Sequence, residues 1–214
     1  SALARFGFEL TDQLGRTRGS SEADPDLQRA AGLLQYPGNV WIWNPSVSLA
    51  PRASSESQYR DARERLLAYN ARLAKGKANY DIRADNLLAT IERFAADIGS
   101  SSALIDRHLN EEAGSFFDAE ADDIFYFTKG KLYGYYMVLQ GLGTDFEPII
   151  KERNLQKPWN EMMESFRKAA LLDPWVVMNG DPDAQFQPNH LATQGFYLLR
   201  ARTQLREISN ILLK

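Results

Sequence analysis

Apolar residues recur at helical spacing along almost all of this chain, and no other feature of the sequence constrains its fold as tightly. The clearest run extends from Pro188 to the chain end, where the apolar positions keep a period of about 3.6 residues. Only the short run NVWIW, residues 39–43, alternates in the way of a β-strand. The sequence therefore predicts an all-α protein. The apolar positions of the last run are Leu191, Leu198, Leu205, Ile208 and Leu212.

Capping residues and prolines predict where several helices begin and end. Asp24 is a good N-cap with Pro25 at the first helical position, and Pro174 cannot continue a helix that begins at Pro158. The serines in GSSS, residues 99–102, leave open whether the long helix beginning near Asp81 stops there or continues. We expect one helical bundle over residues 1–214. Its helices are predicted at 3–16, from 25, 55–76, from 81, 122–143, shortly after 143, 158–174 and 188–214.

The segment DDIFYFTKGKLYGYYMVLQGLG, residues 122–143, is aromatic and apolar but holds two lysines and four glycines. A transmembrane helix needs about 20 mainly apolar residues, and two lysines near its centre make a membrane span unfavourable. We expect this segment to be the central helix of the bundle, covered by neighbours nearly all round. Gly130, Gly134 and Gly141 would then form a stripe that lets another helix approach closely.

The same segment leaves a second interpretation open. The interiors of helical bundles can hold pockets for small apolar or lipid-like ligands. The candidate lining residues for such a pocket are Tyr126, Tyr133, Tyr136 and Trp159.

Residues 35–57 lack helical periodicity and are rich in proline and serine, so they are predicted to form an extended loop within the single domain. Trp41 and Trp43 lie two positions apart in this loop, and in an extended chain they point the same way. The first interpretation is that both rings dock on the body of the protein and anchor the loop. The alternative is that they are exposed and form a contact for a partner or for a membrane interface.

The net charge of −3 and the pI near 5.5 give no overall attraction to nucleic acid, and we expect none as a partner. Locally, residues 52–83 hold eight basic and four acidic side chains, whereas residues 106–123 are strongly acidic. This asymmetry indicates either helices that attract each other within the fold or a surface that steers a charged partner. Arg60, Arg63 and Arg72 are the candidate partner-binding residues on the basic side.

Catalytic and metal-binding signatures are weak. The chain has no cysteine, which excludes disulfides and thiolate metal sites, and it has no nucleotide-binding or hydrolase motif. His108 and Glu112 are four residues apart and would face the same way on a helix, with His190 as a third candidate ligand. A metal-dependent hydrolase that uses these three residues is therefore the weakest hypothesis. We expect no cofactor and no metal. We interpret His108 and Glu112 as part of a solvated, salt-bridged helix face.

The first residues show no signal peptide, and the chain starts at Ser1 without an initiating methionine, so we expect a preceding segment to have been removed. The stretches DPDLQRAAGLLQY, KGKLYGYYMVLQGLG and GFYLLRARTQLREISNILLK resemble a family of uncharacterised proteins from Gram-negative bacteria, over residues 5–214. The resemblance implies an N-terminal transmembrane anchor in the inner membrane and a helical domain that faces the periplasm. It implies no activity and no site residues.

These observations favour a non-enzymatic interaction or scaffold domain at the bacterial envelope. Its partner would be an envelope protein of unknown identity, contacted through Trp41, Trp43 and the basic residues. The two alternatives are the module for an apolar or lipid-like ligand and the metal-dependent hydrolase. The sequence does not predict an oligomeric state.

Overall fold

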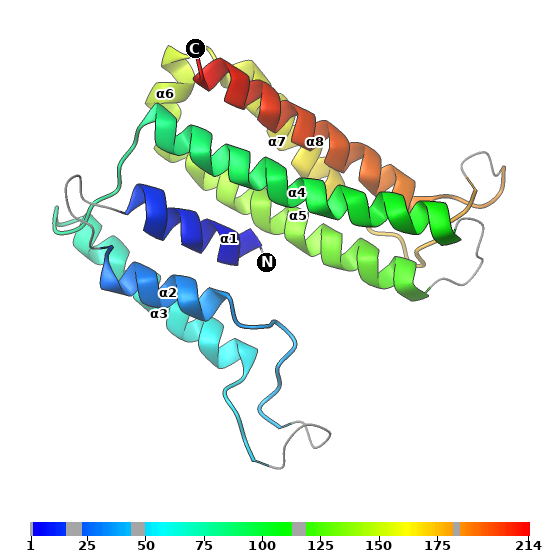
Figure 1. Ribbon diagram of the computed structural model, residues 1–214, viewed down its shortest axis with the longest axis horizontal. Helices are drawn as coiled ribbons and strands as arrows, with labels where there is room; N and C mark the ends of the chain where they lie inside the picture. Colours follow the sequence, from blue (N-terminus) through cyan, green and yellow to red (C-terminus); the bar gives the residue numbers. More distant parts are fainter. Residues whose placement is uncertain (1, 16–22, 44–49, 113–118, 182–184) are drawn as a thin grey trace. The chain divides into compact units, whose positions relative to one another are not determined.

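The computed structural model describes residues 2–15, 23–43, 50–112, 119–181 and 185–214, and within them the chain is an all-α helical protein (Figure 1). The predicted fold class is confirmed. An isolated β-bridge joins Asn179 and Asn189. The helices are α1 (Ala2–Glu9), α2 (Pro25–Leu34), α3 (Ser55–Leu73), α4 (Ala84–Glu112), α5 (Ala119–Asp145), α6 (Glu147–Glu152), α7 (Gln156–Leu171) and α8 (His190–Leu212).

The chain divides into two compact units. Unit 1 comprises residues Leu3–Ile82 with α1 to α3, and unit 2 comprises residues Arg83–Lys214 with α4 to α8. Each unit has its own buried apolar side chains. The expectation of one domain over residues 1–214 stays a prediction.

Unit 1 is a small helical unit in which α2 packs along α3. A π-helical stretch, Leu10–Leu14, follows α1 directly and ends at Gly15. A Cβ at Gly15 would lie 2.3 Å from Leu27 Cδ1 and 2.9 Å from Leu10 O, so this close approach to α2 requires glycine. The predicted start of α2 is confirmed, because the Asp24 carboxylate accepts the backbone N–H of Asp26 at 2.9 Å and Pro25 follows it. The buried apolar residues of this unit are Leu10, Leu14, Ala23, Leu27, Ala30, Ala31, Leu33, Ala62 and Tyr69.

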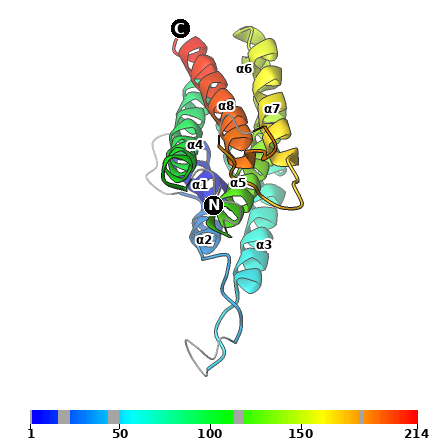
Figure 2. The same cartoon turned by 90° about the vertical axis from the view of Figure 1, so that its right-hand side faces the viewer.

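Unit 2 is built from four long helices. Helix α8 packs on both α4 and α7, and α5 packs mainly on α7 (Figure 2). Helix α4 runs without a break through the GSSS stretch, which answers the question that the sequence left open. The Arg202 guanidinium from α8 lies over Gly99, with Cζ 3.0 Å from the position of a Cβ, so Gly99 is a packing contact rather than a helix stop. None of the helices in the described ranges combines the length and the apolar character of a membrane span.

Burial along α5 differs from the expectation that neighbours would cover the helix nearly all round. Its inner side is buried, whereas Phe127 is 63% exposed and Tyr133 and Met137 are also exposed. A Cβ added at Gly130 or Gly141 would meet nothing within 4 Å, so no helix approaches closely at these two glycines. The expectation was wrong because α5 makes most of its contacts with α7, which leaves its outer side open.

The two lysines of α5 both have acidic partners within unit 2. Lys131 is mostly buried, and its Nζ lies 2.9 Å from Asp97 Oδ2 on α4 and donates to Ser101 Oγ at 2.9 Å. The hydroxyl of Tyr135 donates to the same Asp97 oxygen at 2.6 Å. Lys129 Nζ instead reaches Asp173, just after α7, at 2.6 Å. Lys131 therefore joins α5 to α4 through a polar cluster inside an otherwise apolar contact.

Candidate functional site

The most exposed apolar feature of unit 1 is the segment between α2 and α3, which we call the tryptophan arm and define as residues 37–43 with 50–53. Figure 1 draws it extending beyond the ends of α2 and α3. Trp41 is 75% exposed, Trp43 is 66% exposed, and Ile42 between them is exposed as well. The interpretation that the two rings dock on the body of the protein is therefore wrong. The alternative, an exposed aromatic pair, describes the structure.

Hydrogen bonds hold the backbone of the arm, so its aromatic side chains are not needed as anchors. The Ser55 backbone N–H donates to Val40 O at 2.9 Å, while the Val40 N–H donates to Ser55 Oγ at 2.9 Å. Farther out, the Arg52 N–H donates to Ile42 O at 3.0 Å. The two sides of the arm are thus joined on both sides of Trp41.

Two tyrosines secure the base of the arm. The Tyr59 hydroxyl, on the second turn of α3, donates to Tyr36 O at 2.7 Å, and the Tyr36 hydroxyl donates to Ala53 O at 2.9 Å. Ser55 Oγ also donates to Pro37 O at 2.5 Å. Sequence reasoning missed the roles of Tyr36, Ser55 and Tyr59, because these bonds join residues 15 to 23 positions apart. Together they preorganise the arm on the first turns of α3.

A shallow hollow of about 400 Å³ lies at the base of the arm. Ile42 lines one side of it and the beginning of α3 lines the other. The carboxylates in its wall are largely engaged, because Glu56 pairs with Arg60 and Asp61 pairs with Arg65 at 3.4 Å and with Arg29 at 3.9 Å. The hollow therefore carries little free charge. Its lining residues are Ile42, Ser54, Glu56, Ser57, Arg60, Asp61 and Glu64.

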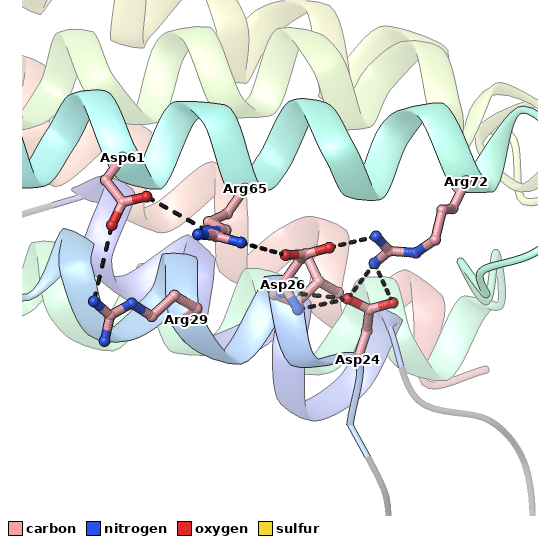
Figure 3. A network of polar contacts seen from close by, with 7 residues as sticks. Asp24, Asp26, Arg29, Asp61, Arg65 and Arg72 are labelled. Carbon is pink, nitrogen blue, oxygen red and sulfur yellow. Dashed lines mark hydrogen bonds and ion pairs between the residues drawn. The ribbon is translucent and has the colours of Figure 1, made fainter.

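The three arginines that were predicted to bind a partner have different environments in the structure. Arg60 and Arg63 are exposed on α3, and Arg60 pairs with Glu56 one turn earlier. Arg72 lies near the far end of α3 and turns toward α2, where its guanidinium pairs with Asp24 at 2.7 Å and with Asp26 (Figure 3). Arg72 thus stabilises the packing of α2 on α3.

The ion-pair network around Arg72 has a clear electrostatic effect. Its hydrogen bond to Asp26 holds the pKa of that carboxyl below its ordinary value, and Arg65 adds to the effect at 3.4 Å. Asp24 also caps α2, so one carboxylate both begins the helix and binds the arginine of its neighbour (Figure 3). Nearby, burial raises the pKa of Tyr69 to about 12, and its hydroxyl donates to Asn79 O. The network is a structural element of unit 1.

The four residues of the ligand hypothesis line none of three hollows on the described residues, the one at the arm and two in unit 2. Tyr126 and Tyr133 are exposed on α5, and the Tyr126 hydroxyl donates to Pro174 O at 2.8 Å. Tyr136 is half-buried, and Trp159 is buried with its indole nitrogen against Gly143. Besides the hollow at the arm, one of about 570 Å³ lies beside Leu88, Ile149 and Leu212, and one of about 240 Å³ lies between α7 and α8. The ligand hypothesis stays a prediction.

The structure gives no support to the metal hypothesis. His108 is buried on α4, and the Glu112 side chain lies outside the described residues. His190 is the first residue of α8, and its Nδ1 accepts the backbone N–H of Met178 at 2.9 Å. Within the described part of the chain, no three histidine or acidic side chains come together in a way that could hold a metal ion.

The features above define an all-α protein whose most exposed apolar residues in unit 1 stand on a preorganised arm. A family model described as an uncharacterised protein conserved in bacteria, DUF2333, matches residues 3–115. The chain belongs to this family. The match covers unit 1 together with α4, and it confirms the predicted membership of an uncharacterised bacterial family. Comparison with curated proteins and with solved structures found no match.

Proposed function

We propose that this chain is a non-enzymatic interaction domain of the bacterial envelope, and that the tryptophan arm is its contact with a protein partner. The observation that carries this proposal is the exposure of Trp41, Ile42 and Trp43 on a backbone held by hydrogen bonds. Tryptophan is enriched among the few residues that supply most of the energy at protein interfaces.

Preorganisation strengthens the argument. Binding costs free energy when a loop must become ordered, and a contact segment that is already held avoids part of that cost. The hydrogen bonds from Ser55, Arg52 and Tyr59 hold the arm before any partner arrives. A loop whose only task was to connect α2 to α3 would not require three consecutive exposed apolar side chains. Exposed Arg60 and Arg63 lie on the helix that follows the arm and would contribute a polar rim.

The envelope setting is a further part of the proposal. The resemblance of the sequence to anchored proteins of Gram-negative bacteria supports an N-terminal anchor in the inner membrane, a periplasmic location and an envelope protein as the partner. Fractionation of the full-length natural protein tests this part separately. We expect it in the inner-membrane fraction, with these residues accessible to a protease only after the outer membrane is opened; recovery in the cytosol would contradict it.

The contact itself is tested with the double variant Trp41→Ala/Trp43→Ala. Crosslinking in envelope extracts identifies the partner, and the affinity of the purified partner is then measured for each variant. We expect binding to weaken by at least about thirtyfold, which corresponds to the loss of one interface residue worth about 2 kcal/mol. The matched control is Trp175→Ala, since Trp175 is a fully exposed tryptophan of unit 2 and its loss is expected to leave binding unchanged. Equal binding by the double variant and the wild type would refute the proposal.

A further inference from the structure

The loop between α7 and α8 is closed at its base by a pair of hydrogen bonds that involve a histidine. The His190 backbone N–H donates to Met178 O at 2.9 Å, and the Met178 N–H donates to the His190 Nδ1 atom at 2.9 Å. His190 is the first residue of α8, so the pair joins the loop directly to the beginning of that helix. We call this pair of bonds the histidine clasp.

Two asparagines continue the contact next to the clasp. Asn189 Nδ2 donates to Gly180 O at 2.5 Å and to Asn179 Oδ1 at 3.2 Å, and its Oδ1 caps α8 by accepting the Ala192 N–H at 2.7 Å. The Gly180 N–H donates to Pro188 O at 3.3 Å. Asn179 is completely buried. The base of the loop is therefore an ordered polar contact rather than a loose connection.

The loop displays apolar side chains on both sides of the clasp. Trp175 and Phe186 are almost fully exposed, and Val176 is exposed too, whereas Val177 is buried just before Met178. The beginning of the loop is tied to α5, because Tyr126 donates to Pro174 O and Lys129 pairs with Asp173. The clasp holds the other end of this segment, from residue 178 onward.

The clasp depends on the protonation state of one atom. An imidazole nitrogen accepts an N–H only while it carries no proton, and in the protonated ring both nitrogens are donors. We infer that the histidine clasp is an acid-sensitive latch: protonation of His190 Nδ1 breaks the bond from the Met178 N–H and loosens the loop at residue 178, next to the segment that displays Trp175. This inference does not depend on the function proposed for the tryptophan arm.

Burial is the sole cause of a lowered pKa at His190, which places its titration below its ordinary value of 6.5. Because the folded pKa is below the unfolded one, the clasp is fully stable above pH 6.5 and loses stability as the pH falls from 6.5 through the folded pKa. Charged and titratable groups on the surrounding elements add nothing to the shift. These groups are Asp173 and Asp181 on the loop, Arg107, His108 and Glu111 near the end of α4, and Lys129 on α5.

Amide hydrogen exchange of Met178, followed by NMR between pH 7.5 and 4.5, tests the inference on the whole chain. The chain has two histidines, so the ring signals of His190 are assigned by their loss in His190→Gln. After correction for the intrinsic pH dependence of exchange, we expect the protection of the Met178 amide to fall about tenfold as His190 gains its proton. Protection in His190→Gln should not change over the same pH range.

Three results would overturn the inference. The first is a His190 ring that titrates at or above pH 6.5, the second is Met178 protection that stays constant through that titration, and the third is an equal pH dependence in His190→Gln. The second is measured on the Met178 amide of the wild-type protein from pH 7.5 to 4.5, so it decides the matter even if the variant does not fold. As an internal reference, the Leu198 amide in the middle of α8 should keep its protection throughout.

Discussion

Replacement of Lys131 by methionine tests how α5 is held in unit 2. We expect Lys131→Met to lower the free energy of unfolding of unit 2 by about 3 kcal/mol, because it breaks an ion pair with a mostly buried carboxylate. The side chains of Lys131 and Asp97 are only 11% and 20% exposed, and their charged atoms lie 2.9 Å apart. The expected loss lies at the low end for a broken buried pair, since the Tyr135 hydroxyl still donates to Asp97.

The same helix offers a matched control two residues earlier. Lys129 pairs with Asp173 at a similar distance, 2.6 Å, but the Asp173 side chain is 76% exposed. An ion pair open to solvent contributes about 1 kcal/mol or less. Lys129→Met should therefore cost much less than Lys131→Met, although both variants remove one lysine from α5.

A double variant separates the loss of the ion pair from the cost of keeping the Asp97 carboxylate buried without Lys131. Lys131→Met combined with Asp97→Asn removes both charges, and we expect it to recover about 1–2 kcal/mol relative to Lys131→Met alone. Native-state hydrogen exchange of amides in α4 and α5 measures the free energy of opening of unit 2 in each variant. The reasoning fails if Lys131→Met costs no more than Lys129→Met, or if Asp97→Asn brings no recovery.

The remaining predictions concern the Asp26 ion pair and two glycines, Gly15 in a close contact and Gly130 in open space. The pKa of Asp26 is lowered in the folded state, so its contribution to stability is present above pH 3.8 and is lost as the pH falls through the folded pKa. Hydrogen exchange in α2, measured over an acid titration, should show this loss in the wild type. The loss should be smaller in Arg72→Met. Gly15→Ala should destabilise unit 1 by about 1–3 kcal/mol through the clash with Leu27 and Leu10, and an unchanged unfolding midpoint would contradict it. Gly130→Ala lies in the open middle of α5 and should instead stabilise unit 2 by about 0.5–1 kcal/mol, measured by the same denaturant titration.

Local signals in the sequence predicted the helices well. Asp24 followed by Pro25 marks a helix start through chemistry confined to neighbouring residues, and the structure confirms it. The long apolar period before the chain end likewise corresponds to α8. Such features depend on residues a few positions apart, and a single sequence contains that information directly.

Features that depend on distant residues could not be predicted in the same way. The partner of Lys131 is Asp97, 34 positions earlier, and the partner of Arg72 is Asp24, 48 positions earlier. Spacing of the glycines in α5 allowed a close helix contact but did not require one, and Gly130 and Gly141 remained open. For the tryptophan arm, the sequence left open whether the two rings are docked or exposed. The rings can be exposed because hydrogen bonds that involve Ser55 and Tyr59 hold the loop without them.

Photocrosslinking in living bacteria tests the central claim about the tryptophan arm most directly. A photoreactive amino acid is placed at Ile42, between the two exposed tryptophans, in the full-length protein. We expect irradiation to give a discrete adduct with one envelope protein, and we expect that adduct to disappear when Trp41 and Trp43 are replaced by alanine. If no adduct forms at Ile42, or if the same adduct persists without the two tryptophans, the arm is not the contact surface of this protein.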